Sequence, residues 1–395
     1  MKHSSYKSLD ICMHDPKIDE KLEYKNRIES SNTVILPFDI NGYPAFFVRI
    51  PEMTDLIYEI LLANAEIAKL AASTPNISPL LYSCLLDEIQ MSNEIEGIHS
   101  SKKELAKVDL NQASNKDLRF ASQIQQYRKL LDDSIHFPHT AKEVAEAYEQ
   151  IFLQDPPGIE KELFPDGVWF RKGDVIVGNG IRIFHTGVQS EEKIIEVLDQ
   201  SLQAIQNEKA ILQAALFHFI FGYVHPFYDG NGRLNRFLCS VKLADELELA
   251  GILKFSLVLR NNRKRYYRMF EQAEVPMNKG ELTPFILSFL QLLYQSFKEG
   301  IEFLQYVNNQ YAFYLKGIED TPNLSKTEKS FLQHMAYLEV FCILGQPQSE
   351  IAETIQCSKP MVQKMVKKFD HLLYKEKMGR TFIYRLNRNA FLVKS

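Results

Sequence analysis

An uncharged apolar run, Ile211–Val224 ("ILQAALFHFIFGYV"), most strongly limits how this chain can fold. It is shorter than the about 20 residues that cross a bilayer, so we expect a helix buried inside the protein. The 395-residue chain has 45% apolar and 24% charged residues, which is typical of a globular protein with two or three domains. We therefore expect no membrane span, and the polar N-terminal stretch predicts a cytoplasmic protein. The five cysteines, without a CxxC pair, are expected to be reduced thiols.

The loop "HPFYDGNGRLNR" follows this run directly and leads into a helix expected over 230–249. A helix start presents unpaired backbone N–H groups and the positive end of the helix dipole. Gly230 and Gly232 allow the backbone to approach an anion closely. The position and composition of the loop therefore predict a phosphate-binding site.

The charged side chains of the loop extend this prediction. Arg233 and Arg236 are three residues apart, hence on one side of the helix, and their guanidinium groups can clamp a polyphosphate. Asp229 would repel phosphate unless a cation lay between them, which implies Mg²⁺. His225 precedes Pro226, so its backbone is not helical and its ring is expected at the mouth of the loop, as a general base. Each feature alone is common in ordinary turns and helix faces, and their conjunction favours a nucleotide site.

The residues from His225 to Arg233, followed by Arg236, resemble the HPFx(D/E)GNGRxxR signature of the Fic family. The resemblance implies an α-helical core that transfers AMP from ATP to a Ser, Thr or Tyr hydroxyl of a target protein. By position, it assigns the following roles: His225 accepts the hydroxyl proton, Phe227 anchors the loop, Asp229 holds Mg²⁺, Gly230, Asn231 and Gly232 hold the phosphates, Arg233 neutralises the triphosphate, and Arg236 reaches its γ end.

A second match lies upstream in "MSNEIEG", where Ser92, Glu96 and Gly97 fit the inhibitory pattern (S/T)xxxE(G/N) of one Fic subclass. The resemblance implies an inhibitory helix at about 78–97 whose Glu96 pairs with Arg236. A carboxylate in that position competes with the γ-phosphate of ATP, so the enzyme would be autoinhibited. Removal of AMP by the same glutamate, as in some relatives, stays an alternative, and Glu96 as an ordinary helix-end carboxylate is another.

Two further segments resemble substrate-binding parts of the family. The expected hairpin at 168–184, with its turn at Gly178-Asn179-Gly180, corresponds to the flap that receives the target segment by β-augmentation, and its docking residues would be Val175, Ile176 and Val177. Tyr266 and Tyr267 resemble the pair that lines the adenine pocket, although Glu274 stands where relatives often carry asparagine. Ordinary hairpin and core packing are the alternatives for these residues.

The rest of the chain predicts a mainly α fold. A small hairpin is expected around Asn41-Gly42, and the domains are placed at 1–135, 136–316 and 317–395. The helix after Pro51 should bury a stripe of Leu56, Ile60, Leu61, Ile67 and Leu70. Further helices are expected over 78–97 with Ser78 as N-cap, 116–134, 140–153, 191–206, 208–222 and 262–274, then as a pair over 283–316 before a linker at 317–325.

The C-terminal segment is basic. Residues 324–395 hold 12 Lys and Arg against 6 Asp and Glu, so their net charge is 12 − 6 = +6, whereas the preceding 323 residues carry 34 − 44 = −10. A capped helix at "SKTEKSFLQHMAYL", two short helices and a strand pair around Met378-Gly379-Arg380 predict a winged helix-turn-helix. Its second helix would bury Met361, Val362 and Met365 and present to DNA the side chains Lys359, Gln363, Lys364 and Lys367. Docking to a protein instead of DNA is the alternative.

Together these features predict a Fic-type helical core with a β-hairpin flap, an N-terminal helical region with a small β element and a C-terminal winged helix domain. The predicted function is an autoinhibited protein adenylyltransferase with ATP as substrate, Mg²⁺ as cofactor and an unidentified protein target. The alternatives are a DNA-binding regulator with a nucleotide-sensing core, a de-AMPylase and a transferase of another phosphate-linked group. No membrane partner is expected, and a homodimer is compatible with the sequence.

Overall fold

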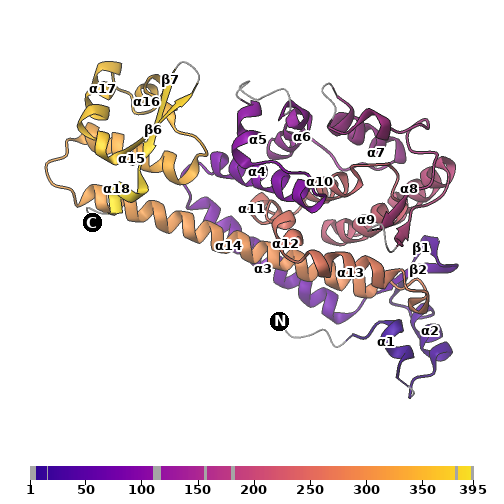
Figure 1. The fold of residues 1–395 in the computed structure, drawn as a ribbon. Helices are drawn as coiled ribbons and strands as arrows, with labels where there is room; N and C mark the ends of the chain where they lie inside the picture. The colour runs from indigo at the N-terminus through magenta and orange to yellow at the C-terminus, as the bar shows by residue number, and fades with distance from the viewer. Residues whose placement is uncertain are drawn as a thin grey trace.

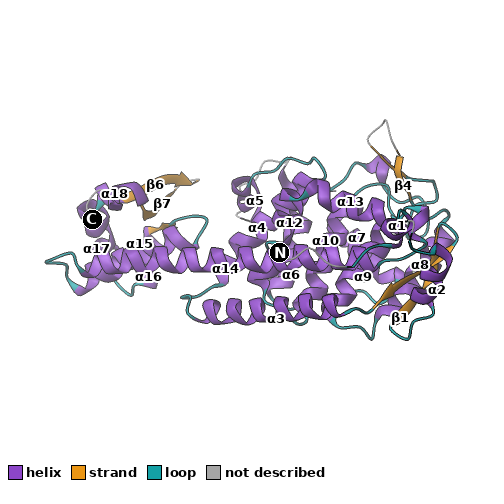
Figure 2. Ribbon diagram, turned by 90° about the horizontal axis from the view of Figure 1, so that it is seen from below, coloured by secondary structure: helices purple, strands orange, loops and turns teal. Residues whose placement is uncertain are grey.

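The computed structural model describes residues 6–15, 17–109, 117–154, 158–178, 183–378 and 381–392. Helices dominate this part of the chain, and the strands form two separate hairpins and one three-stranded sheet (Figure 2). The predicted mainly α fold class is confirmed. No helix among the described residues combines the length and the apolar character that a membrane crossing needs.

The N-terminal region combines two short helices, α1 (Leu9–Met13) and α2 (Glu20–Ile28), with the hairpin β1 (Thr33–Ile40) and β2 (Tyr43–Val48). The strands pair antiparallel, with Ile40 opposite Tyr43. Asn41 and Gly42 have φ values of 53° and 79°, the left-handed geometry of a tight hairpin turn. The predicted turn at Asn41-Gly42 is confirmed.

Two long helices lie side by side: α3 (Pro51–Ala72) and α14 (Thr283–Glu319), which extends from the N-terminal hairpin to the C-terminal module (Figure 1). The prediction of two helices over 283–316 was wrong, because α14 is one helix of 37 residues. Gly300, near the middle of α14, is a close-packing position: a Cβ there would stand 2.7 Å from the carbonyl oxygen of Ala250. Gly300 therefore lets another segment approach the helix and does not end it.

Two details of the predicted helices were also wrong. Ile60 and Ile67 of α3 are buried, but Leu61 is 44% exposed, because it lies about 100° around the helix from Ile60. In α4 (Ser78–Ile95), Ser78 is the first helical residue and the N-cap position falls on Ile77. Pro79 explains this start, because proline fits the first turn of a helix, where the missing N–H is not needed.

The central region is a helical assembly around α9. Its helices are α5 (Lys102–Asp109), α6 (Ala121–Leu131), α7 (Ala141–Tyr148), α8 (Glu191–Ile205), α9 (Ala210–Val224), α10 (Asn231–Ala244), α11 (Leu249–Ile252), α12 (Phe255–Asn261) and α13 (Arg263–Ala273). Helix α7 continues as a π-helix over Glu149–Leu153, and short 3-10 turns occur at Asp117–Phe120, Lys161–Leu163 and Pro276–Asn278. The expected helix over 116–134 begins only at the 3-10 turn in the described residues. The small helices α5, α11 and α12 were not predicted.

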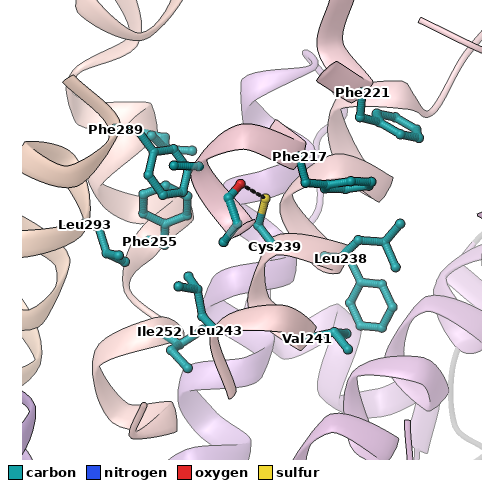
Figure 3. Close-up of a cluster of buried hydrophobic side chains, with 14 of the residues drawn as sticks. Phe217, Phe221, Leu238, Cys239, Val241, Leu243, Ile252, Phe255, Phe289 and Leu293 are labelled. Atoms are coloured by element: carbon teal, nitrogen blue, oxygen red, sulfur yellow. Dashed lines mark hydrogen bonds between the residues drawn. The ribbon is translucent and has the colours of Figure 1, made fainter. Parts of the chain in front are cut away.

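Helix α9 is buried around its whole circumference, as its apolar sequence predicts. Figure 3 shows Phe217 and Phe221 of α9 packed with Leu238 and Cys239 of α10, while α12 and α14 supply further apolar side chains. Since α9 ends and α10 begins at the two ends of the loop 225–230, this core fixes both ends of the predicted site.

The C-terminal module consists of α15 (Lys326–Phe341), α16 (Gln348–Thr354), α17 (Lys359–Lys368), α18 (Arg388–Leu392), a 3-10 turn (Asp370–Leu372) and the strands β5 (Gln346–Pro347), β6 (Leu373–Met378) and β7 (Thr381–Leu386) in the order β5-β7-β6. Ser325 and Glu328 form a capping box at the start of α15, so the predicted capped helix is confirmed. The predicted turn residues Gly379 and Arg380 lie outside the described residues.

The boundary of this module differs from the predicted linker. Residues 317–319 belong to α14, and Tyr314 and Ile318 of that helix are buried in the core of the C-terminal module. Met361 of α17 is 44% exposed, whereas Val362 and Met365 are buried. The prediction that Met361 belongs to the core was wrong, because the buried side of α17 follows the Val362–Met365 spacing.

Candidate active site

The loop "HPFYDG" joins the C-terminus of α9 to the N-terminus of α10. His225 ends α9 in the left-handed conformation, with φ 49° and ψ 61°, and its N–H bonds to the carbonyl of Phe221 over 3.0 Å. Pro226 disfavours helical geometry at His225, which explains why α9 ends there. Gly230 begins α10 with a φ of 82°, which suits glycine. The local sequence therefore accounts for the end of α9 and for the turn at Gly230, but not for the left-handed backbone of His225, since proline favours an extended residue before it.

Contacts within the loop hold its shape. The side-chain oxygen of Asn231 accepts from the N–H of Phe227 over 3.0 Å, and its side-chain nitrogen donates to the carbonyl of Phe227 over 2.7 Å. The buried Phe227 ring stacks on Tyr148 with centroids 3.6 Å apart, and the Tyr148 hydroxyl donates to the carbonyl of Asp229. The Asn231 side chain is thus used to hold the loop. The groups suited to bind a phosphate are the backbone N–H groups of Asn231 and Gly232 at the start of α10.

Arg233 and Asp229 lie together at the start of α10. Arg233 Nη2 donates to Asp229 Oδ2 over 3.0 Å, and the guanidinium stands 4.6 Å from the Phe152 ring centroid. The buried Arg233 Nε has no hydrogen-bond partner among the described residues. A buried donor without a partner is costly, so this nitrogen suits an anionic ligand. The Asp229 side chain is 37% exposed and is accessible to a ligand.

The donor set around Asp229 fits Mg²⁺ that arrives with a nucleotide. The described residues include no group of three or more His, Cys, Asp or Glu side chains that could hold a metal. Mg²⁺ commonly binds through one or two carboxylates together with substrate phosphates and water. A single accessible carboxylate beside a helix N-terminus matches this requirement.

Arg236 is fully buried and bonds to α4. Its Nε donates to Ser92 Oγ over 2.9 Å, and its Nη2 donates to the Ser92 carbonyl over 2.9 Å and to Glu96 Oε1 over 2.8 Å. Burial is the largest single effect and lowers the pKa of Arg236, but Glu96 together with Tyr266 and Tyr267 more than offsets it, so that the pKa is raised. Gly97, with φ 77°, follows the end of α4. The structure thus brings Ser92 and Glu96 of the predicted inhibitory pattern onto the second arginine of the loop, and Gly97 follows directly at the end of the helix.

Glu96 also covers the start of α10. A Cβ on Gly232 would stand only 2.0 Å from Glu96 Oε1. Glu96 therefore occupies space directly beside the predicted phosphate-binding backbone, and Gly232 is required for this approach.

His225 is a neutral imidazole at pH 7. Burial lowers its pKa to about 4, with smaller contributions from His185 and from the Arg171 guanidinium. Its Nδ1 faces the carbonyl of Gly222 at 3.4 Å, so Nδ1 carries the proton and Nε2 is left as the acceptor. This protonation state is the one that a general base needs.

The hairpin β3 (Ile176–Gly178) and β4 (Ile183–Thr186) stands next to His225. Ile176 pairs with Thr186, and the Ile176 side chain is 59% exposed. The Val175 carbonyl accepts from the N–H of Gly187 over 3.1 Å, and Val177 pairs with His185. Asn179 and Gly180 of the predicted turn lie outside the described residues, as does the side chain of Val177.

His185 of β4 fastens this hairpin to the helical body. Its Nδ1 lies 2.6 Å from Glu274 Oε2 and its Nε2 lies 2.6 Å from the carbonyl of Tyr223. Its ring centroid is 6.4 Å from that of His225. These contacts could not be predicted from local sequence patterns, because they join residues far apart in the chain.

The two predicted adenine-pocket tyrosines have different surroundings. Tyr266 is buried, and its hydroxyl lies 3.0 Å from His218 Nε2, so this side chain is part of the core. Tyr267 is 39% exposed, and its hydroxyl donates to the carbonyl of Ile95 near the end of α4. Of the pair, only Tyr267 presents its ring to solvent beside Glu96.

The predicted DNA-contacting side chains are far along the chain from this site, on α17. Lys359, Gln363, Lys364 and Lys367 are all exposed. They share the side of α17 that faces away from Val362 and Met365, which are buried in the module.

Comparison with known proteins supports this description. Residues 139–243 match the Fic/DOC family. A crystal structure of a Fic family protein from Desulfovibrio desulfuricans is similar to this chain, with 19% identity, a TM-score of 0.54 and coverage of 86% of this chain and 97% of that chain. Fic-1 from C. elegans is also similar, with 15% identity, a TM-score of 0.41 and coverage of 64% of this chain and 73% of that chain. A Fic domain containing signaling protein from Bacteroides thetaiotaomicron has 17% identity, a TM-score of 0.43 and coverage of 64% of this chain and 97% of that chain.

These matches define the class of the central region. Residues 139–243 form a Fic/DOC family domain, and the resemblance to the D. desulfuricans protein shows a shared fold. Fic domain proteins generally transfer phosphate-linked groups such as AMP to proteins. The matched range contains the whole loop from His225 to Arg236.

Proposed function

We propose that this protein is an adenylyltransferase that moves AMP from ATP to a hydroxyl side chain of a target protein. The observation that carries the proposal is the arrangement at the start of α10. There a neutral His225, the accessible carboxylate of Asp229 and the buried guanidiniums of Arg233 and Arg236 surround one helix N-terminus. This arrangement combines a base with groups that bind polyphosphate.

In the proposed reaction, His225 Nε2 accepts the proton of the target hydroxyl. The hydroxyl oxygen then forms a bond to the α-phosphorus of ATP, and the bond from that phosphorus to the bridging oxygen breaks, releasing pyrophosphate. Backbone N–H groups at Asn231 and Gly232 and the Arg233 guanidinium bind phosphate oxygens. Mg²⁺ bound with ATP at Asp229 neutralises phosphate charge.

The resting protein is proposed to be autoinhibited by Glu96. Its carboxylate holds the Arg236 guanidinium over 2.8 Å and stands against Gly232, so it fills the region proposed for the γ-phosphate. Ser92 Oγ and the Ser92 carbonyl hold the same guanidinium in this arrangement. ATP must displace a charge-assisted bond in order to bind with its γ-phosphate on Arg236, which weakens productive binding.

The flap is proposed to receive the target segment. Ile176 is exposed on β3, and an extended segment added along this strand would place a hydroxyl next to His225. The His185 contacts to Glu274 and to Tyr223 keep β4 in place while the segment binds.

Two labels on ATP test the proposal. The Glu96→Gly variant is incubated with Mg²⁺ and ATP labelled either at the α-phosphate or at the γ-phosphate, alone and with a cell lysate. AMP transfer predicts that protein acquires the α label and not the γ label, and that adding His225→Ala abolishes the signal. Incorporation of the γ label would indicate a kinase, and no incorporation by a folded variant would contradict the proposal.

A second proposed activity is binding of DNA by the C-terminal module. It is supported by the exposed side chains Lys359, Gln363, Lys364 and Lys367 of α17 and by the net charge of 12 − 6 = +6 over residues 324–395. Replacing Lys364 and Lys367 by glutamate should weaken binding to a duplex and flatten its salt dependence, since phosphate contacts release counterions. Binding that does not change with salt or with these substitutions would favour a protein partner.

A further inference from the structure

Arg171 is a fully buried arginine that lies just before the flap and bonds to the backbone of the catalytic loop. Its Nε donates to the carbonyl of His225 over 2.8 Å, and its Nη2 donates to the carbonyls of Val188 (2.9 Å) and Val224 (3.3 Å). Its Nη1 donates to the carbonyl of Gly173 over 2.6 Å. One guanidinium thus joins the end of α9 to both sides of the flap.

The backbone of Arg171 adds a further bond to the same stretch. Its N–H donates to the carbonyl of Pro226 over 3.2 Å. Arg171 therefore binds three consecutive carbonyls, those of Val224, His225 and Pro226. The left-handed turn at His225 takes the chain out of the helix, so these carbonyls have no helical donor. The Val224 carbonyl also accepts from the N–H of Val188 over 3.1 Å.

No carboxylate within the described part of the chain forms an ion pair with Arg171, although Asp174 attracts it at longer range. Its charge lies instead at the C-terminus of α9, where the helix dipole is negative. Burial lowers the pKa of Arg171. A buried cation that binds only carbonyl groups is costly for stability. We therefore expect Arg171 to have a role other than stabilising the fold.

The surroundings fix this side chain from two sides. A Cβ on Gly187 would stand 2.4 Å from Arg171 Nη2 and 3.1 Å from His225 Cβ, so only glycine fits there. The Glu191 carboxylate accepts the N–H groups of Val168, Trp169 and Phe170 over 2.6–2.9 Å and thereby holds the segment that leads into Arg171.

We propose that Arg171 is the positioning residue for His225 and fixes the left-handed backbone from which the imidazole projects. Its charge also adds a smaller contribution to the burial and the His185 effect that keep this imidazole neutral. The proposal rests on the proposed function of His225 as general base. Arg171 would act through His225 only and would not touch the nucleotide.

These two roles can be separated by substitution. Arg171→Lys keeps the charge but loses the fork that binds several carbonyls, so the base should remain neutral but be misplaced. Arg171→Met removes both the charge and the fork. Gly187→Ala leaves Arg171 in the chain and pushes its Nη2 out of position. Lys172→Met, at the exposed neighbouring position, is the matched control.

The variants are made in the Glu96→Gly background, and two quantities are measured. The first measurement gives the kcat for AMP transfer together with the KM for ATP. We expect kcat to fall by about 100-fold in Arg171→Met, Arg171→Lys and Gly187→Ala with KM changed by less than about threefold, because displacement of a catalytic group by about 1 Å has that effect. Fluorescence of Trp169, the only tryptophan, reports whether the segment before Arg171 still packs.

The second quantity is the NMR titration of His225, whose signal is the one lost on His225→Ala. Its midpoint, about 4 in the unchanged site, should rise in Arg171→Met and stay low in Arg171→Lys. Of the other charged groups that face His225, His185 is unchanged in both variants, and Glu96 is replaced by glycine in both, so neither differs between them. The titration needs no activity, so it tests Arg171 even if Glu96→Gly transfers no AMP and the proposed function fails.

Low kcat in the three folded variants, with a raised midpoint only in Arg171→Met, would support the proposal. Unchanged kcat together with an unchanged midpoint would overturn it and leave Arg171 as an anchor of the flap base. If Arg171→Met does not fold, Arg171→Lys decides the positioning role by the same kinetic criterion, because a Cβ on Gly187 would also crowd His225 directly.

Discussion

Arg236 Nη2 and Glu96 Oε1 lie 2.8 Å apart although the two residues are separated by 140 positions in the chain. The contact joins α4, outside the matched Fic/DOC range, to α10 inside it. Because Arg236 is buried and Glu96 is partly exposed, the pair can be opened from the Glu96 side without unfolding α10.

Replacement of Glu96 by glycine should raise AMP incorporation from ATP by about tenfold or more, since a charge-assisted bond of about 1.5–3 kcal/mol no longer opposes ATP. Labelling with α-labelled ATP measures the effect. Glu94→Gly is the matched control, because Glu94 lies on the same helix but pairs with Arg260. Equal labelling by the two variants would show that Glu96 has no special role.

Replacement of Ser92 by alanine should open the same contact only in part. The Ser92 hydroxyl is one of three acceptors of Arg236, and the other two remain. We expect labelling between that of the unchanged protein and that of Glu96→Gly, and a loss of about 1–3 kcal/mol in the free energy of unfolding, measured with urea. Full activation by Ser92→Ala would mean that Glu96 depends on Ser92 for its position.

The pH dependence of AMP transfer should reflect the low pKa of His225. The base is neutral above its pKa of about 4, so its protonation should not limit kcat between pH 6 and 8 in Glu96→Gly. Below about pH 4, kcat should fall tenfold for each pH unit while the protein remains folded. A midpoint near 6.5, the ordinary value for histidine, would show that His225 is solvated in the active state.

Glu88, on the buried side of α4, should make stability depend on pH. Its carboxylate accepts from the N–H of Ser256, and burial raises the pKa of Glu88 to about 7 against the attraction of Arg236 and Lys254. Between about pH 7 and pH 4.5 the folded state therefore binds a proton that the unfolded state does not.

The pH dependence of the free energy of unfolding can be compared between the unchanged protein and Glu88→Gln. Acidification from pH 7 to 4.5 should stabilise the unchanged protein relative to the variant by about 1.4 kcal/mol for each pH unit. Urea unfolding at several pH values checks it. A difference between the two proteins that does not change with pH would contradict a raised pKa for Glu88.

Some of the site could be predicted from sequence because its geometry is local. The end of α9 before Pro226 and the left-handed turn at Gly230 follow from proline and from glycine within the loop itself. The left-handed backbone of His225 does not, because proline favours an extended residue before it. The signature and the inhibitory pattern also suggested the Glu96–Arg236 pair. The mainly α fold followed from the helical periodicity of most segments and from the buried run at α9.

The remaining features depend on contacts between distant segments. Arg171 reaches His225 across 54 positions, and His185 reaches Glu274 across 89. Nothing in the local sequence distinguishes these side chains from exposed ones. The errors at Leu61 and Met361 have a related cause, since periodicity gives the spacing of a buried stripe but not its exact rotation toward the core.

Nucleotide affinity tests most directly whether Glu96 occupies the place of the γ-phosphate. Calorimetric titration of ATP and of ADP, each with Mg²⁺, compares His225→Ala with the double variant His225→Ala/Glu96→Gly, so that no turnover occurs. The account predicts that removing Glu96 tightens the binding of ATP by about tenfold and leaves that of ADP nearly unchanged. Equal tightening of both nucleotides, or no change for ATP, would contradict it.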